Sequence, residues 1–264
     1  MSHLDADRPK TAEGREYHLH TKAGDLAPYC LLVGDPDRAE MIASKFLKNA
    51  VKVGDHRGLK SFTGENFDGL PVSVVTTGMG GASIGIVLPE AVRSGARTFI
   101  RVGSCGALRK EVRVGDIAVC TAAVRLDGAS ENWAPMEWPA AADWRVTAAL
   151  AKAAKVRRVA AHFGIGVTTA CFNEGQARPD DAGYVPRRIR QRHKEFVRRG
   201  ALFYSMEEAA MFVWCSTHGG IPCGAVNAVF ANRVTGEFGT LGEETAAEIA
   251  LMAVGLLRLS GSSP

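Results

Sequence analysis

The sequence predicts an α/β fold: a single domain of three layers, in which helices flank both faces of a central mixed β-sheet. Short apolar runs rich in β-branched residues alternate along the chain with segments of helical periodicity. Glycine follows several of these runs, as in turns that lead from a strand into a helix. No linker, repeat or low-complexity block divides the 264 residues. We therefore expect a flexible N-terminal arm over residues 1–15 and one domain over residues 16–264.

The expected elements succeed one another from residue 29 onwards. A strand at Tyr29–Val33 is separated from a helix at Arg38–Phe46 by a turn that contains Gly34 and Pro36. Further strands are expected at Leu70–Thr77, Thr98–Val102, Asp116–Ala123, Phe163–Ala170 and Ile221–Phe230. Further helices are expected at Ser83–Arg93, Ala140–Val156 and Met206–Thr217. In such a sheet, ligands bind in the loops just beyond the carboxyl ends of the strands.

Composition and charge exclude several classes of protein. Hydrophobic residues make up 46% and charged residues 23% of the chain, as in globular rather than disordered or collagen-like proteins. The 32 Lys and Arg against 28 Asp and Glu give a net charge of +4, a weak field for binding nucleic acid. The most basic segment, Arg187–Arg199, lacks interleaved aromatic residues and helix-turn-helix spacing. We interpret it as the solvated face of a surface helix, with a phosphate or nucleic-acid site as the alternative.

The cysteines and the N-terminus bear on the cellular compartment. Six cysteines lie scattered without a C-x-x-C pair or zinc-ligand spacing, so we expect no metal site. The first ten residues carry no apolar signal core, and no apolar run approaches the roughly 18 residues that cross a bilayer. Free thiols without an export signal predict a cytoplasmic protein with no membrane contact.

The glycine-rich stretch Gly78–Gly85 allows three interpretations. It begins like a dinucleotide-binding fingerprint, but Ser83 stands where the third glycine belongs. It also contains a G-x-S-x-G pattern, the nucleophile elbow of hydrolases, for which His162, His193 or His218 could supply the base. We favour the third interpretation, a glycine turn that lets a strand and a helix pack closely.

Two segments combine glycine and arginine at expected strand ends. In Gly34–Arg38 (GDPDR), a glycine N–H can approach an anion, and Arg38 opens the next helix. In Arg101–Ser104 (RVGS), a guanidinium, a backbone donor and a hydroxyl come together. Either segment alone is weak evidence, because an arginine at a strand end is more often a structural ion-pair partner. Together the two segments can converge on one phosphate.

Several motifs in this order resemble the nucleoside phosphorylases of the trimeric-to-hexameric type. They are GDPDR at 34–38, HR at 56–57, TGMGG at 77–81, RVGSCGAL at 101–108, VGD at 114–116 and RLDGAS at 125–130. The segment FNEGQAR at 172–178 is similar to the F-x-x-G-Q-x-R pattern of the uridine phosphorylase branch. SME at 205–207 resembles the family's E-M-E ribose motif, and NR at 232–233 closes the pattern.

The resemblance implies a phosphate site and a shared active site. In the family, residues that match Gly34, Arg38, Arg101 and Ser104 bind phosphate, and an arginine that matches Arg57 reaches in from the neighbouring subunit. Three arginines can neutralise a phosphate dianion without a metal. The resemblance therefore implies a homo-oligomer, expected as a hexamer built as a trimer of dimers, with active sites shared across a dimer interface.

The resemblance also implies a ribose site. Met206 would pack beneath the sugar, and Glu207 would accept hydrogen bonds from its hydroxyl groups. The family's subunit-crossing histidine, near the 5′-hydroxyl, is best matched by His18, with His20 as the alternative. Ser205 stands where relatives have glutamate, so sugar affinity or tolerance of 2′-deoxyribose is expected to differ.

The implied base site indicates a pyrimidine. The amide of Gln176 can donate to and accept from the uracil edge, Arg178 offers donors to a carbonyl, and Phe172 supplies a wall. Purine-specific relatives use an aspartate in the late loop to protonate the base. Asn232 matches that position and cannot act as a general acid.

The implied activity is the reversible phosphorolysis of uridine, with deoxyuridine and thymidine as further substrates left open. Arg101, Gln176 and Arg178 are the candidate catalytic residues, and phosphate is a co-substrate without any cofactor. Some relatives hold a monovalent cation through a glutamate where this chain has Gly58, so we expect that ion site to be weak or absent. The alternatives are a purine or broad-specificity phosphorylase, a nucleosidase that uses water, and a non-catalytic nucleoside-binding homologue.

Overall fold

The computed structural model describes residues 5–259. Within them the strands are β1 (Tyr29–Val33), β2 (Lys48–His56), β3 (Leu59–Glu65), β4 (Pro71–Thr76), β5 (Thr98–Ala107), β6 (Ile117–Leu126), β7 (Ala140–Ala141), β8 (Ala161–Thr169), β9 (Phe203–Ser205) and β10 (Cys223–Asn232). The α-helices are α1 (Pro36–Phe46), α2 (Gly81–Ser94), α3 (Trp144–Arg157), α4 (Arg187–Arg198), α5 (Glu208–Thr217) and α6 (Glu243–Leu259).

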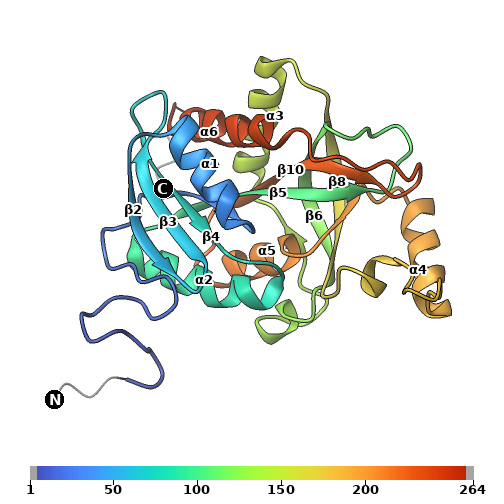
Figure 1. Ribbon diagram of the computed structural model, residues 1–264, viewed down its shortest axis with the longest axis horizontal. Coiled ribbons are helices and arrows are strands. Elements are labelled where there is room, and N and C mark those ends of the chain that lie inside the picture. Colours follow the sequence, from blue (N-terminus) through green and yellow to red (C-terminus); the bar gives the residue numbers. More distant parts are fainter. Residues whose placement is uncertain (1–4, 260–264) are drawn as a thin grey trace.

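The strands form one mixed sheet, as expected, in the order β10-β6-β8-β9-β5-β1-β4-β3-β2, with β7 paired to β6 (Figure 1). β1 is parallel to β4 and β5, and β8 is parallel to β6 and β9. β10 is antiparallel to β6 and also pairs in parallel with β5. This second pairing closes β5, β10, β6, β8 and β9 into a ring, which brings residues far apart in sequence to one end of the sheet.

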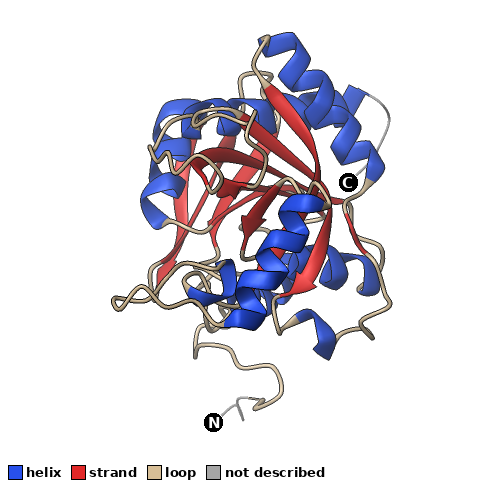
Figure 2. Cartoon of the chain, turned by 90° about the vertical axis from the view of Figure 1, so that its right-hand side faces the viewer, coloured by secondary structure: helices blue, strands red, loops and turns tan. Residues whose placement is uncertain are grey.

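Helices cover both faces of the sheet, so the three-layer arrangement is confirmed (Figures 1 and 2). α2 and α5 share a core with one face around Ile84 and Phe212. α1, α3 and α6 share a core with the other face around Ile42 and Leu150. Strands of a parallel sheet covered on both faces are continuous apolar runs, and all five residues of β1 are buried.

The turn after β1 begins α1 in a way that its residues dictate. Asp35 is the N-cap, and its side chain accepts a hydrogen bond from the N–H of Asp37 at 2.9 Å. Pro36 occupies the first helical position, where its missing N–H has no intrahelical partner to lose. Gly34 packs against the β4–α2 turn, since a Cβ there would lie 3.3 Å from the carbonyl oxygen of Gly78. Arg38 is thereby fixed on the first turn of α1.

The strand expected at Thr98–Val102 is longer than predicted. β5 continues to Ala107, in register with β10 as far as the pair formed by Ala107 and Asn232. Position 103 inside this strand requires glycine, because a Cβ there would lie only 2.3 Å from Oδ1 of Asn227. The expectation of a strand end at Val102 is therefore wrong: Ser104 lies within a strand, not beyond one.

Other element boundaries also differ from the expectations. The helix expected at Ala140–Val156 begins at Trp144, because Asp143 caps it and residues 140–141 pair with β6 as β7. The helix expected at Met206–Thr217 begins at Glu208. β2, β3, β9 and α6 were not assigned from the sequence. None of the helices in residues 5–259 is both long and apolar enough to span a membrane.

The N-terminal segment lies away from the body of the domain in Figure 1. Residues 5–15 contain no strand or helix beyond a single bridge between Lys10 and Glu16. Residues 1–4 of the expected arm, and residues 260–264 of the expected domain, lie outside the described residues.

Candidate active site

One cavity of about 480 Å³ lies where the β1–α1 turn, β5, β10, the segment after β8 and the β9–α5 turn meet. Its lining residues are Gly34, Asp35, Pro36, Arg38, Met79, Arg101, Ser104, Cys105, Gly106, Phe172, Gln176, Arg178, Tyr204, Ser205, Met206, Glu207, Phe230, Ala231 and Phe238. The structure thus brings together all the residues that were expected to bind substrate, except His18 and Arg57.

Arg38 contributes a buried guanidinium to this cavity. Its Nε donates to Oε1 of Glu243 at 2.6 Å, and its Nη2 lies 2.5 Å from the same oxygen. Its Nη1 donates to the carbonyl oxygen of Val102 at 3.3 Å, and the ring centre of Phe230 lies 5.9 Å from its Cζ. These contacts fix the orientation of the guanidinium, as an anion site requires.

Arg101 and Ser104 enter the cavity from β5. Nη2 of Arg101 donates to Oε2 of Glu207, and Nε of Arg101 lies 3.7 Å from Oε1 of Glu208. Arg101 is only 4% exposed, so its charge is balanced by buried carboxylates rather than by water. Arginine, hydroxyl and the glycine turn of β1–α1 provide donors suited to a small dianion.

Glu207 and Met206 form the β9–α5 turn beside Arg101. Oε1 of Glu207 accepts a hydrogen bond from the N–H of Gly80 at 2.7 Å, which ties this turn to the start of α2. Burial raises the pKa of Glu207; Arg101 opposes the increase, and Glu208 adds to it. Met206 supplies an apolar surface next to this acceptor, a combination suited to the face and hydroxyl groups of a sugar.

Phe172, Gln176 and Arg178 form one hydrogen-bonded unit after β8. Nη1 of Arg178 donates to Oε1 of Gln176 and to the carbonyl oxygen of Phe172, both at 2.6 Å. Its guanidinium also lies 3.6 Å from the ring centre of Phe172. Nε2 of Gln176 donates to Oγ1 of Thr169 at 3.2 Å. An amide, a guanidinium and an aromatic face are thus held together at the cavity wall.

Arg233 is bonded to this unit and Tyr204 lines the same cavity; neither residue was assigned a role from the sequence. Nη2 of Arg233 donates to the carbonyl oxygen of Gln176 at 3.3 Å. Burial and the nearby Arg233 lower the pKa of Arg178 to about 10. Within residues 5–259 neither arginine forms an ion pair, so this part of the cavity favours an anion. Two signals in the sequence point to these residues: Tyr204 directly precedes the 205–207 motif, and Arg233 belongs to the NR pair.

His18 and Arg57 lie together outside this cavity. The imidazole Nδ1 of His18 lies 2.7 Å from Oε1 of Glu90, and Nη2 of Arg57 donates to the hydroxyl of Tyr17 at 3.3 Å. Tyr17 also packs edge-to-face on the ring of His18. Arg57 and Gly58 are the two central residues of the β2–β3 hairpin, with φ of 55° and 76°, which explains the glycine at position 58.

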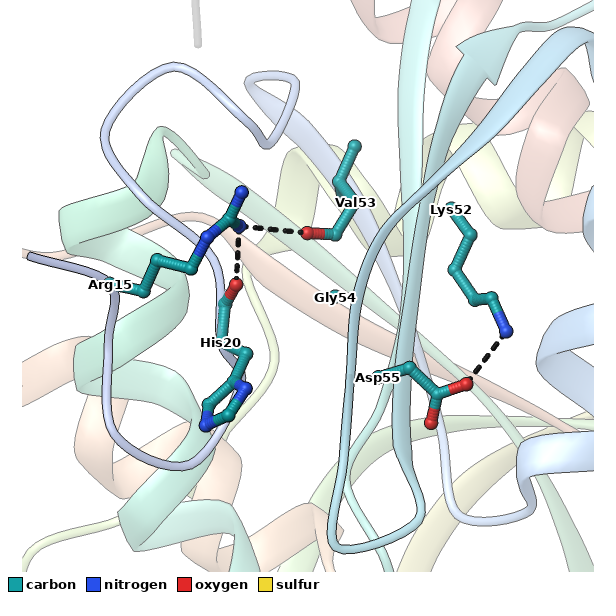
Figure 3. Close-up of a pocket in the computed structure, with 6 residues that line it drawn as sticks. All are labelled: Arg15, His20, Lys52, Val53, Gly54 and Asp55. Carbon is teal, nitrogen blue, oxygen red and sulfur yellow. Dashed lines mark hydrogen bonds and ion pairs between the residues drawn. The ribbon is translucent and has the colours of Figure 1, made fainter. Parts of the chain in front are cut away.

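A second, smaller hollow lies beside this N-terminal segment and is lined by Arg15, His20 and Lys52–Asp55 (Figure 3). Nη1 of Arg15 donates to the carbonyl oxygens of His20 and Val53. Nζ of Lys52 donates to Oδ2 of Asp55 at 2.7 Å. Because its cations are bonded to groups of the same chain, this hollow offers no free guanidinium or ammonium for an anion.

Asn232 does not line the main cavity. Its Nδ2 donates to the carbonyl oxygens of Arg109 and Val112, and its Oδ1 accepts from the N–H groups of Val234 and Thr235. The side chain therefore joins the loop after β5 to the turn after β10. Asn232, the residue that matches the aspartate of purine-specific relatives, therefore has a structural role within the single chain.

Among residues 5–259, Ser83 forms no triad with a histidine and an acid, so the structure does not support the hydrolase interpretation of Gly78–Gly85. Oγ of Ser83 donates to the carbonyl oxygen of Met79 at 3.1 Å. His162 contacts Asp116, His193 contacts Tyr204, and His218 contacts the backbone of Trp214. Gly80 is the N-cap of α2 with a φ of 90°, a conformation that glycine adopts without strain.

The basic segment forms α4 at the periphery of the molecule (Figure 1). Ile189 is the buried residue of this helix, and Phe196 and Val197 pack against a small cluster with Tyr204. Glu195 pairs with Arg198 and Arg199, and the remaining basic side chains of the helix form no ion pair with described residues. The helix is therefore attached by one apolar stripe, with an arginine-rich face toward solvent.

Comparison with known proteins places the chain in a family. The model of the phosphorylase superfamily matches residues 28–257. A uridine phosphorylase of Thermococcus kodakarensis is 42% identical over 254 residues, which cover 96% of this chain and 91% of the relative. A uridine phosphorylase of Escherichia coli is 39% identical, over 84% of this chain and 87% of the relative. A guanosine phosphorylase of Halorubrum lacusprofundi is 30% identical, over 84% and 86%.

The superfamily match spans the β1–α1 turn, β5, the segment after β8 and the β9–α5 turn that together build the cavity. The superfamily model covers far more than half of the sequence, and relatives well above 30% identity align along most of both chains. The chain therefore belongs to the phosphorylase superfamily.

Proposed function

We propose that this protein catalyses the reversible phosphorolysis of uridine to uracil and ribose 1-phosphate. The observation that carries the proposal is one cavity that combines two separate recognition units. The first holds Arg38, Arg101 and Ser104, which suit phosphate, and the second holds Gln176 and Arg178, which suit a uracil edge. The names of the relatives from Thermococcus kodakarensis and Escherichia coli support the same activity.

The chemistry requires positioning and charge stabilisation rather than a covalent enzyme intermediate. A phosphate oxygen forms a bond to the anomeric carbon while the glycosidic bond breaks. The electron pair of the broken bond passes to the uracil nitrogen. Arg38 and Arg101 bind the nucleophile, and phosphate oxygens near the sugar stabilise the developing oxocarbenium ion. Arg178, with the positive charge of Arg233 nearby, stabilises the negative charge that builds on uracil.

The remaining properties belong to the same proposal. Inorganic phosphate is the co-substrate, with no resident cofactor, and the protein acts in the cytoplasm without a nucleic-acid partner. The protein is a homo-oligomer in which His18 and Arg57 complete the active site of a neighbouring copy, as a hexamer built from dimers. The position of both side chains outside their own chain's cavity, beside Tyr17, supports this arrangement.

The decisive experiment measures uridine loss with and without inorganic phosphate and identifies the sugar product. We expect uracil release that depends on phosphate and yields ribose 1-phosphate. Release of uracil without phosphate would instead indicate a nucleosidase. Faster turnover of inosine than of uridine would indicate a purine phosphorylase, and binding without turnover would indicate a non-catalytic homologue.

A further inference from the structure

Glu208 is a buried carboxylate that the proposed reaction does not use. It is the first residue of α5, is fully buried, and does not line the cavity. Its Oε1 accepts a hydrogen bond from Nδ2 of Asn227 at 2.9 Å, and its Oε2 has no hydrogen-bond partner. A buried carboxylate destabilises a protein unless it is paired, so this residue calls for an explanation.

The cation nearest to Glu208 is Arg101, which it shares with Glu207. Nε of Arg101 lies 3.7 Å from Oε1 of Glu208, and Nη2 of Arg101 donates to Glu207. Among residues 5–259, neither glutamate forms an ion pair with another cation. Two carboxylates therefore compete for one guanidinium at the wall of the cavity.

Gly103 and Asn227 confine this guanidinium from the side of the sheet. They are register partners on β5 and β10. A Cβ at position 103 would lie 2.3 Å from Oδ1 of Asn227 and 3.1 Å from Cζ of Arg101. The side chains of Arg101 and Asn227 therefore occupy the space over Gly103, and only glycine leaves that space free.

The polar groups of this cluster are incompletely hydrogen-bonded. Eight buried side-chain nitrogen or oxygen atoms of the described residues have no hydrogen-bond partner, and four belong here: Nε and Nη1 of Arg101, Oε2 of Glu208 and Oδ1 of Asn227. Such groups are rare in folded proteins and concentrate where function requires them. Buried polar atoms without hydrogen-bond partners thus surround Arg101, which lines the cavity.

We propose that Glu208, held in place by Asn227, is a positioning residue for Arg101 and limits the affinity of this arginine for phosphate. The inference rests on the proposed function, because it assigns Arg101 to phosphate. The negative charge of Glu208 opposes a dianion that approaches Arg101, while its contact keeps the guanidinium oriented. Weaker ground-state binding with retained orientation favours turnover over tight binding.

The test replaces Glu208 by glutamine, which has the same size and keeps an oxygen for Asn227 but removes the charge. In Glu208→Gln we expect the phosphate dissociation constant, measured by titration calorimetry, to fall by about fivefold or more, because a like charge near the anion is gone. We expect kcat for uridine to fall about tenfold through lost orientation, with KM for uridine changed less than about twofold. A loss of folded protein alone would lower the apparent kcat but would leave the phosphate dissociation constant unchanged.

Two further variants separate charge from geometry. Asn227→Ser removes the amide group that donates to Glu208 but leaves the carboxylate, so kcat should fall without tighter phosphate binding. In an Arg101→Met background, Glu208→Gln should not lower kcat further, because its positioning effect passes through the guanidinium. Asp116→Asn, which removes a carboxylate from the contact with His162 outside the cavity, is the matched control and should leave phosphate affinity unchanged.

The outcomes distinguish this inference from the proposed function. Unchanged phosphate affinity and kcat in Glu208→Gln overturn the inference. If that variant does not fold, a wild-type kcat in Asn227→Ser overturns it. A wild-type protein that binds phosphate but does not cleave uridine overturns the proposed function alone, and the calorimetric comparison then decides the inference. A wild-type protein that binds no phosphate overturns both.

Discussion

Arg178 donates a hydrogen bond from Nη1 to Oε1 of Gln176 at 2.6 Å, so the two residues expected to contact the base also contact each other. The amide nitrogen of Gln176 is turned toward Oγ1 of Thr169, and the side chain is only 2% exposed. Both recognition groups are therefore oriented before any ligand binds. Donors that need no reorganisation stabilise a developing anion more effectively than mobile ones.

Replacement of Arg178 by alanine should strongly reduce turnover of uridine while phosphate still binds. Loss of one preorganised donor to a developing anion costs about 2.7–4 kcal/mol in the barrier, or about 10²–10³ in kcat. Steady-state kinetics with uridine and calorimetry with phosphate alone check the two halves of this prediction. Arg188→Ala, on the exposed face of α4, is the control. Near-normal turnover in Arg178→Ala would remove this residue from the base site.

Replacement of Asn232 by aspartate should destabilise the protein rather than open it to purines. Nδ2 of Asn232 donates to the carbonyl oxygens of Arg109 and Val112, and a carboxylate oxygen in its place would face those carbonyls. An unsatisfied buried acceptor costs about 1–3 kcal/mol, which lowers Tm by about 2–4 °C per kcal/mol in a chain of this size. Thermal melts and an inosine assay test this. A stable variant that cleaves inosine would contradict it.

The sequence was most informative where elements are buried and regular. β1, with five buried residues from Tyr29 to Val33, was predicted with its correct bounds, because a strand covered on both faces is a continuous apolar run. β2 was missed because most of its residues are exposed and polar, and its pairing in the β2–β3 hairpin is not encoded in a local apolar pattern. The predicted strand ended too early, at Val102, because the glycine at position 103 is required by Asn227, which is distant in sequence and pairs with it on β10.

The candidate site was predictable as a set of motifs but not as a set of contacts. The motifs around Arg38, Arg101 and Gln176 converge on one cavity, although Arg38 and Gln176 lie 138 positions apart in the sequence. The counter-charges are different: Glu243 beside Arg38 lies in a segment without a recognised motif, and Glu208 beside Arg101 lies one residue beyond the 205–207 motif. Such partners depend on tertiary packing, which a single sequence does not reveal.

Acid should destabilise the protein partly through His193. Burial and the positive charge of Arg233 lower the pKa of His193 from its ordinary value of 6.5, so the folded state keeps the ring neutral. In the unfolded chain His193 binds a proton near its ordinary pKa of 6.5. The free energy of unfolding therefore decreases as the pH falls below 6.5. Between about pH 8 and about pH 5, the decrease in Tm should be smaller in His193→Asn than in the wild type. An equal decrease in both proteins would contradict this assignment.

Glu90 should be required for the function of His18. The N–H groups of His18 and Leu19 and the ring Nδ1 of His18 all contact the carboxylate of Glu90, which is buried on α2. Glu90→Gln places an amide NH₂ against these donors and should lower kcat/KM for uridine by about 10-fold or more, as expected for loss of a charge-assisted bond. Its effect and that of His18→Ala should not add in the double variant. Additive losses would show that Glu90 acts independently of His18.

Mixing two inactive variants should restore activity if active sites are shared between copies. His18 lies outside the cavity of its own chain, whereas Arg178 lines that cavity. In a mixed dimer of His18→Ala and Arg178→Ala chains, one shared site carries both substitutions and the other carries neither. After unfolding and refolding of an equal mixture, about a quarter of the sites should be intact, if the chains pair at random in an isologous dimer. Refolding each variant alone is the control, and a mixture no more active than its components would show that each chain builds its site by itself.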